Sequence, residues 1–151
     1  MKKLLVKFSS LLLLVVAFAF TANTAYADKK PLMGKKLVVI VKTADPTEAG
    51  MGLSLANSAA KKGAIVTIVL GAHATAYAVK KGGQNIFPAK KLSLRDMLKS
   101  TIKNGATVHL CKTCAVFHGL AEKDLIKGVK IEPSLTIFNA MYEDGVRVMS
   151  Y

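Results

Sequence analysis

Cysteine is scarce in this chain of 151 residues, which contains only Cys111 and Cys114. A redox couple, an assisted nucleophile, a thiolate metal site or a disulfide must therefore use this one pair. Acidic residues are also few, nine against 22 basic ones, so the formal net charge is +13. Aromatic residues do not interleave with the lysines as a stacking platform for nucleic acid requires. Nucleic acid is therefore not an expected partner.

The first 27 residues have the pattern of a secretory signal peptide. A start with three lysines precedes an apolar run over residues 11–20 and the small-x-small sequence Ala25-Tyr26-Ala27. The apolar run is too short for a typical membrane span, and no cysteine at the cleavage point offers a site for a lipid anchor. We therefore predict cleavage after Ala27, a periplasmic or secreted location, and no stable membrane anchor after cleavage.

Residues 28–151 have the length of one domain with a single core. Three lysines lie in the predicted signal, so this part carries 19 basic and nine acidic residues, a net charge of +10. The lysines are mostly paired and spread along the chain, which favours solvated edges, although a positive field also attracts an anionic substrate or an acidic partner. The pairs lie at residues 29–30, 35–36, 61–62, 80–81 and 90–91.

Four segments are expected to form strands. Residues 35–42 form a short continuous apolar run rich in β-branched residues, which is typical of a strand buried on both faces. Residues 64–71 are expected to form a second buried strand, and residues 106–111 a third strand. Residues 146–151 are expected to form a last strand. Since helical patterns separate these runs, the chain predicts a single α/β domain, a three-layer sandwich around a mostly parallel sheet.

Helices are expected between these strands. The first begins at an Asp45 cap and ends at Gly63, and the second, opened by Ser93, is clearly amphipathic. The first is expected to have Met51, Leu55 and Ala59 on one face. Further helices are expected at residues 72–83, 120–128 and 134–145, the last with Leu135, Phe138, Met141 and Tyr142 on one side, and a loop at 84–91.

The two cysteines are expected to differ in their chemistry. Cys111 ends a strand, and sites in parallel sheets form beyond such ends. It also begins a helix, where unpaired backbone N–H groups favour a thiolate or persulfide anion. Cys114, one helical turn on, is placed to resolve, shuttle or protect the product. A structural disulfide is the default alternative in an oxidising compartment, but closing so short a loop stabilises a fold by only about 2 kcal/mol.

A metal site is a second alternative. His109 shares one side of the strand with Cys111, and His118 shares a helix face with Cys114. Four such ligands suit copper or zinc, but all lie within ten residues, whereas zinc sites usually take their ligand pairs from separate elements. His73 adds little to such a site. The predicted site therefore contains no metal ligand and no cofactor. A metal-binding module and a thiol–disulfide oxidoreductase are the two alternative functions for the cysteine pair.

From Lys36 to Tyr151 the chain resembles the DsrE/DsrF-like family, which includes the sulfur-relay subunits of the Tus and Dsr systems. The resemblance is carried by "GATVHLCKTCAVFHGLAEKDLIKGVKI" and by the closing "YEDGVRVMSY". It implies a DsrE/F-like (flavodoxin-like) fold, assembly into trimers or hexamers, and a persulfide on the strand-end cysteine, here Cys111. Cys114 is matched by small residues in some members and by a second cysteine in others.

The sequence therefore predicts a periplasmic sulfur carrier, or sulfurtransferase-like protein, with Cys111 and Cys114 as its catalytic residues. Cys111 is expected to accept sulfane sulfur from an anionic donor, namely polysulfide, thiosulfate or a protein persulfide. Cys114 is expected to discharge it by forming the disulfide. The predicted export separates this protein from the cytoplasmic partners of the relay proteins, so the acceptor protein is left open.

Overall fold

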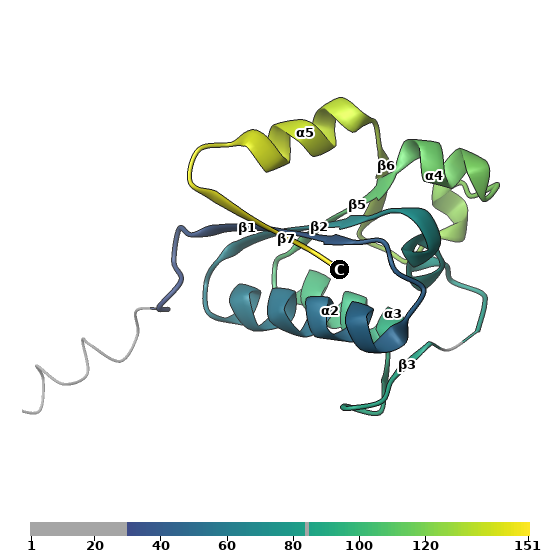
Figure 1. Cartoon of the computed structure of the whole chain (residues 1–151), viewed down its shortest axis with the longest axis horizontal. Coiled ribbons are helices and arrows are strands. Elements are labelled where there is room, and N and C mark those ends of the chain that lie inside the picture. The colour runs from purple at the N-terminus through teal and green to yellow at the C-terminus, as the bar shows by residue number, and fades with distance from the viewer. Residues whose placement is uncertain (1–29, 84) are drawn as a thin grey trace, which may run out of the picture. The chain divides into compact units, whose positions relative to one another are not determined.

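Five parallel strands form the central sheet of residues 30–83 and 85–151, the part of the chain that the computed structural model describes (Figure 1). The predicted signal peptide lies outside these residues. Among the described residues, no helix has the length and apolar character needed to cross a membrane. The strands are β1 (Lys36–Val41), β2 (Ile65–Leu70), β5 (Thr107–Cys111), β6 (Val129–Glu132) and β7 (Val146–Ser150), in the spatial order β6-β5-β2-β1-β7.

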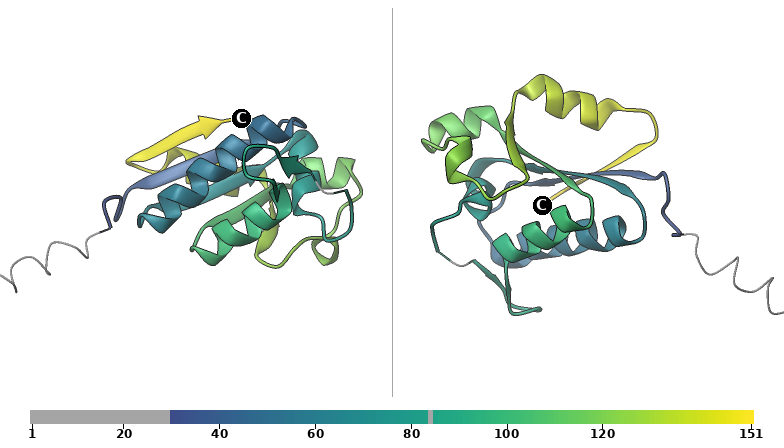
Figure 2. Two further views of the ribbon diagram at one scale, coloured as in Figure 1. Left: turned by 90° about the horizontal axis from the view of Figure 1, so that it is seen from below. Right: turned by 180° about the vertical axis from the view of Figure 1, so that it is seen from behind.

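Helices cover both faces of this sheet. The connections from β1 to β2 and from β2 to β5 run in one direction across the sheet, and α2 (Pro46–Lys61) and α3 (Leu94–Lys103) lie side by side on one face (Figure 2). The connection from β6 to β7 runs back across the sheet and places α5 (Ser134–Tyr142) on the opposite face (Figure 1). Right-handed crossovers require this exchange of faces. The predicted α/β sandwich around a parallel sheet is confirmed.

The main core lies between the sheet and the α2 and α3 helices. Val39 and Val41 of β1, Ile68 of β2 and Leu110 of β5 are fully buried there. Val38, which points to the other face of β1, is also buried. The continuous apolar run in β1 thus reflects a strand covered on both sides, as predicted.

Helix α2 buries the predicted face only in part. Of the three residues of that face Ala59 is buried, but Met51 and Leu55 are exposed, whereas Leu53 and Ala56 are fully buried. The reason is close packing, because a Cβ added at Gly50 would lie only 2.2 Å from Cγ of the Phe87 ring. The helix therefore turns its small residues and Leu53 toward its neighbours, while Met51 and Leu55 remain outside.

The segment at residues 120–128 is not the predicted helix. Only a 3-10 turn, η2 (Glu122–Asp124), forms, and its start is held by the Asp124 carboxylate, which accepts the Ala121 N–H at 2.9 Å. The following backbone pairs with the end of another 3-10 helix, η1 (Ala72–Ala78), where Ile126 N–H donates to the Ala78 carbonyl at 2.8 Å. These tertiary hydrogen bonds replace the ones that a helix would form.

The remaining differences concern short elements. The predicted helix at residues 72–83 is the shorter η1, the predicted loop at 84–91 contributes to a small hairpin, and β6 was not predicted. Strand β6 has only four residues, which are alternately apolar and charged. So short a run is a weak signal for a strand. The hairpin strands are β3 (Ile86–Phe87) and β4 (Leu92–Ser93).

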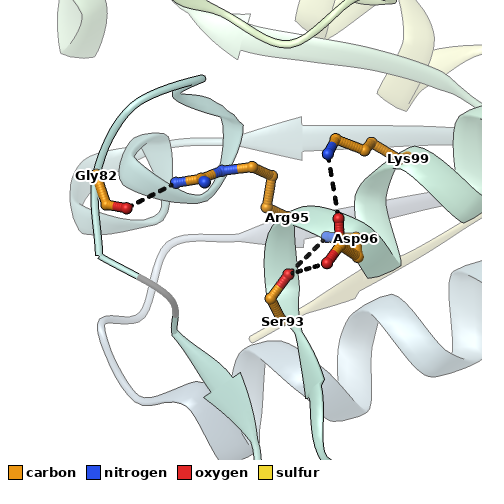
Figure 3. Close-up of polar contacts among 5 residues, drawn as sticks. All are labelled: Gly82, Ser93, Arg95, Asp96 and Lys99. Atoms are coloured by element: carbon orange, nitrogen blue, oxygen red, sulfur yellow. Dashed lines mark hydrogen bonds and ion pairs between the residues drawn. The ribbon is translucent and has the colours of Figure 1, made fainter.

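The predicted start of α3 is confirmed in detail. The Ser93 hydroxyl accepts the Asp96 N–H at 3.0 Å and donates to the Asp96 carboxylate at 2.7 Å (Figure 3). Lys99 Nζ donates to the other Asp96 carboxylate oxygen at 3.1 Å. The hydrogen bond from Ser93, followed by that from Lys99, lowers the pKa of Asp96. At the same end, Arg95 donates to the Gly82 carbonyl at 3.3 Å and ties the preceding loop to the helix.

Ser93→Ala is expected to lower the free energy of unfolding by about 1 kcal/mol at neutral pH, because the N-cap hydrogen bond is lost. The lowered pKa of Asp96 means that its carboxylate contributes stability above its unfolded pKa of about 3.9 and loses it as the pH falls through the folded value. The difference between wild type and variant should therefore shrink once the pH falls below the unfolded pKa and through the lower folded one. Urea denaturation at neutral and at acidic pH measures this, and a pH-independent difference would contradict it.

Candidate functional site

Both cysteines lie at the carboxyl edge of the sheet. Cys111 is the last residue of β5 and the N-cap of α4 (Lys112–Phe117), and Cys114 lies within that helix. Both are free and partly buried. Cys111 is close enough to Cys114 to raise the pKa of its thiol. The sequence-based prediction that the pair sits just beyond the end of a parallel strand is therefore matched by the structure.

The neighbouring strand contributes the main backbone contact to this pair. Strand β2 lies beside β5, and the chain that leaves it passes the cysteines, where the Ala72 N–H donates to Sγ of Cys114 at 3.2 Å. Ala72 has a φ of +46°, in the left-handed region that residues other than glycine seldom adopt. Such backbone strain tends to occur at functional sites. Here it occurs at the residue whose N–H reaches a sulfur atom.

Ala72 was not among the predicted site residues. The sequence marks residues 72–83 only as a helical segment, and Ala72 reaches Cys114 because β2 and β5 are adjacent in the sheet. The methyl side chain of alanine has no reactive or hydrogen-bonding group that would mark it as a site residue. The adjacency of the two strand ends is the only sequence-accessible clue, and it requires the strand order to be known.

The environment of the two sulfur atoms is unequal. Burial raises the pKa of Cys114, the hydrogen bond with the Cys111 side chain raises it further, and the Ala72 N–H opposes both. Cys114 is therefore a thiol at neutral pH. Cys111 accepts no capping hydrogen bond from α4, which has only six residues. The backbone N–H predicted to face Cys111 is instead supplied to Cys114, and it comes from another element.

A pocket of about 380 Å³ opens beside Cys114. Its wall is mostly apolar, and Cys111 does not line it. Phe117 is 83% exposed at this place, and its ring meets the His118 ring edge to face with centroids 5.0 Å apart. The lining residues are Ala72, His73, Thr113, Cys114, Phe117 and His118.

The four ligands of the alternative metal site are not brought together. His118 lies with Cys114 at the pocket, whereas His109 points from β5 into partly buried surroundings, where its Nδ1 has no hydrogen-bond partner. Burial lowers the pKa of His109, although the nearby Glu132 opposes this. Among residues 30–83 and 85–151, no group of three or more histidine, cysteine, aspartate or glutamate side chains is placed to hold a metal ion.

The position of the cysteine pair in this fold agrees with a comparison of the sequence with known families, in which residues 35–151 match the DsrE/DsrF-like family. The chain belongs to this family. The match covers the whole sheet and both cysteines, and a DsrE/DsrF-like identity is consistent with a role related to sulfur relay. No match was found among curated proteins.

Solved structures of similar proteins support the same fold. The ychN protein from E. coli is 20% identical, with a TM-score of 0.66, and the match covers 79% of this chain and all of that one. A protein of unknown function from Methanobacterium thermoautotrophicum is 12% identical, with a TM-score of 0.62, over 78% of this chain and 99% of that one. Another from Bacteroides thetaiotaomicron is 16% identical, with a TM-score of 0.56, over 78% and 95%. These identities establish the fold alone.

Proposed function

We propose that this DsrE/DsrF-like protein is an exported sulfur carrier that holds sulfane sulfur as a persulfide on Cys111. The observation that carries the proposal is the pair of free cysteines, three residues apart at the end of β5 and beside an open pocket. Sulfur transfer needs a thiol that a donor can reach and a second thiol that can displace the sulfur. The net positive charge of the chain favours an anionic donor.

The proposed discharge uses the second cysteine. The Cys114 thiolate attacks Sγ of the Cys111 persulfide, the Sγ–Sγ bond forms, and the outer sulfur leaves as hydrosulfide. The two cysteine sulfurs are oxidised to the disulfide while the sulfane sulfur is reduced. The closeness of the two thiols, three residues apart at one strand end, supports this step. A protein acceptor that takes the persulfide sulfur directly is the other fate of the cargo, and its identity is open.

Treatment of the purified, reduced protein with polysulfide is expected to add mass in steps of about 32 Da, one sulfur atom each. Fragment masses at equilibrium should place the added sulfur on Cys111. The matched control is the double variant Cys111→Ser with Cys114→Ser, which should gain no mass. A wild-type protein whose mass does not change would overturn the proposal.

We also propose that the protein is a homo-oligomer, a trimer or a hexamer. Helix α5 has no fully buried residue, and it exposes Leu135, Phe138 and Tyr142 by 68%, 52% and 81%. Val148 of β7, which lies beside Val38 and so points to the same face of the sheet as α5, is exposed as well. Exposed apolar side chains that gather in this way mark interaction surfaces. We call these four residues the α5 patch.

A further inference from the structure

We propose that Cys114 is the residue through which sulfur enters the site, that it passes the sulfur to Cys111, and that the donor is a polysulfide and not thiosulfate. This inference rests on the proposed carrier function and adds to it an order of transfer and a substrate class. It reverses the order in which the two sulfurs meet the donor, since the sequence alone favours Cys111 as the first acceptor.

The first argument is the position of the two sulfurs. Cys114 lines the pocket, and Cys111 does not. Cys111 is the N-cap of the helix that contains Cys114, and it is close enough to raise the pKa of the Cys114 thiol, so Cys111 receives sulfur most directly from Cys114. A donor that occupies the pocket therefore reaches Cys114 before it reaches Cys111.

The second argument is the N–H group of Ala72. It lies 3.2 Å from Sγ of Cys114 and is held in place by a left-handed backbone conformation. A fixed N–H donor stabilises a sulfur that carries negative charge. The Cys114 sulfur carries such charge twice during the transfer, first as its proton passes to the departing polysulfide and then as the leaving thiolate. Among the described residues, no backbone donor to Cys111 from α4 is found.

The third argument is the chemistry of the pocket wall. No lysine or arginine lines the pocket, and its only basic side chains are the imidazoles of His73 and His118. The strongly hydrated sulfonate of thiosulfate would therefore be desolvated there without a permanent cation, which is costly. The inner sulfur atoms of a polysulfide are soft and uncharged, and sulfur makes favourable contacts with aromatic rings such as that of Phe117. Because Phe117 is largely exposed, the charged end of the polysulfide can stay in water.

The transfer sequence balances without an added oxidant or reductant. In the first step Sγ of Cys114 forms a bond to a terminal sulfur of the polysulfide, one S–S bond breaks, and a polysulfide shorter by one sulfur leaves with the thiol proton. In the second step the Cys111 thiolate attacks the outer sulfur of the Cys114 persulfide. The new S–S bond forms on Cys111, and Cys114 leaves as a thiolate that takes the proton of Cys111.

Rapid-quench mass spectrometry of the purified protein with inorganic polysulfide tests the order of transfer. Cys111→Ser is expected to gain one sulfur, on Cys114, at an initial rate within about twofold of wild type, and Cys114→Ser to load Cys111 at least about tenfold more slowly. If Cys114→Ser loads as fast as wild type, the entry role is wrong although the carrier function stands. If wild type never loads, the carrier function itself fails.

Surface variants and a second donor test the pocket. Phe117→Ala should slow loading by polysulfide several-fold, whereas Val116→Ala, a neighbour that is 73% exposed and does not line the pocket, should not. Equal rates for both variants would overturn the role of the pocket. Thiosulfate should add no sulfur to wild type in the same interval, and loading by thiosulfate at the polysulfide rate would overturn the donor assignment.

Discussion

Leu53→Ala is expected to lower the free energy of unfolding by about 3 kcal/mol. Leu53 is fully buried between α2 and the sheet, within the main core. Truncation removes its apolar contacts and leaves a cavity that the surrounding β-branched side chains cannot fill without moving. Urea denaturation of the purified protein, followed by circular dichroism, measures the effect.

Leu55→Ala is the matched control on the same helix. Leu55 is 43% exposed, so the same chemical change should cost less than about 1 kcal/mol. This pair distinguishes the observed face of α2 from the one that the sequence predicts, in which Leu55 points inward. Equal losses of stability in the two variants would contradict the observed orientation of the helix.

Phe138→Asp is expected to convert the proposed oligomer into a monomer. Phe138 lies in the α5 patch, and an aspartate there would have to be buried without a partner when a second copy covers the patch, which is strongly unfavourable. The change in oligomeric state is expected to be complete at micromolar protein concentrations. Light scattering coupled to size-exclusion chromatography measures the mass of the particle directly.

Met51→Asp is the control for the charge that this variant introduces. Met51 and Phe138 are both 52% exposed on helix surfaces, but Met51 lies on α2, which covers the opposite face of the sheet. Its substitution should leave the oligomer intact. A monomeric wild type, or dissociation of both variants, would overturn the assignment of the α5 patch as the interface.

The local elements of this fold follow largely from short-range patterns in the sequence. Apolar runs rich in β-branched residues predict β1 and β2, because such runs are typical of strands buried on both faces. The short segment that ends at Cys111 predicts β5. Ser93 and Asp96 predict the start of α3, because the capping hydrogen bonds link residues only three positions apart. The position of Cys111 at a strand end follows from the same local pattern. These features depend on neighbours in the sequence and need no knowledge of the rest of the chain.

The candidate site has one part that the sequence predicts and another that it does not. The spacing of Cys111 and Cys114, together with the apolar run that precedes them, is enough to predict both sulfurs at one strand end. Their different surroundings could not be predicted, because the donor to Cys114 is the backbone of Ala72, which is 42 positions away in the sequence. The pocket likewise combines residues that follow β2 with residues of α4. Backbone groups leave no signal in residue type, so only the strand order brings them to the sulfur.

The sequence by itself determined the α/β class, the cysteine pair at a strand end and the excess of positive charge. The tertiary structure alone decided which face of α2 is buried, why residues 120–128 do not form a helix, and which of the two sulfurs lines the pocket. The physical reason is the range of the interactions. Caps and apolar runs act within a few residues, whereas close packing at Gly50, backbone pairing at Ile126 and the Ala72 N–H act between segments that only the folded chain brings together.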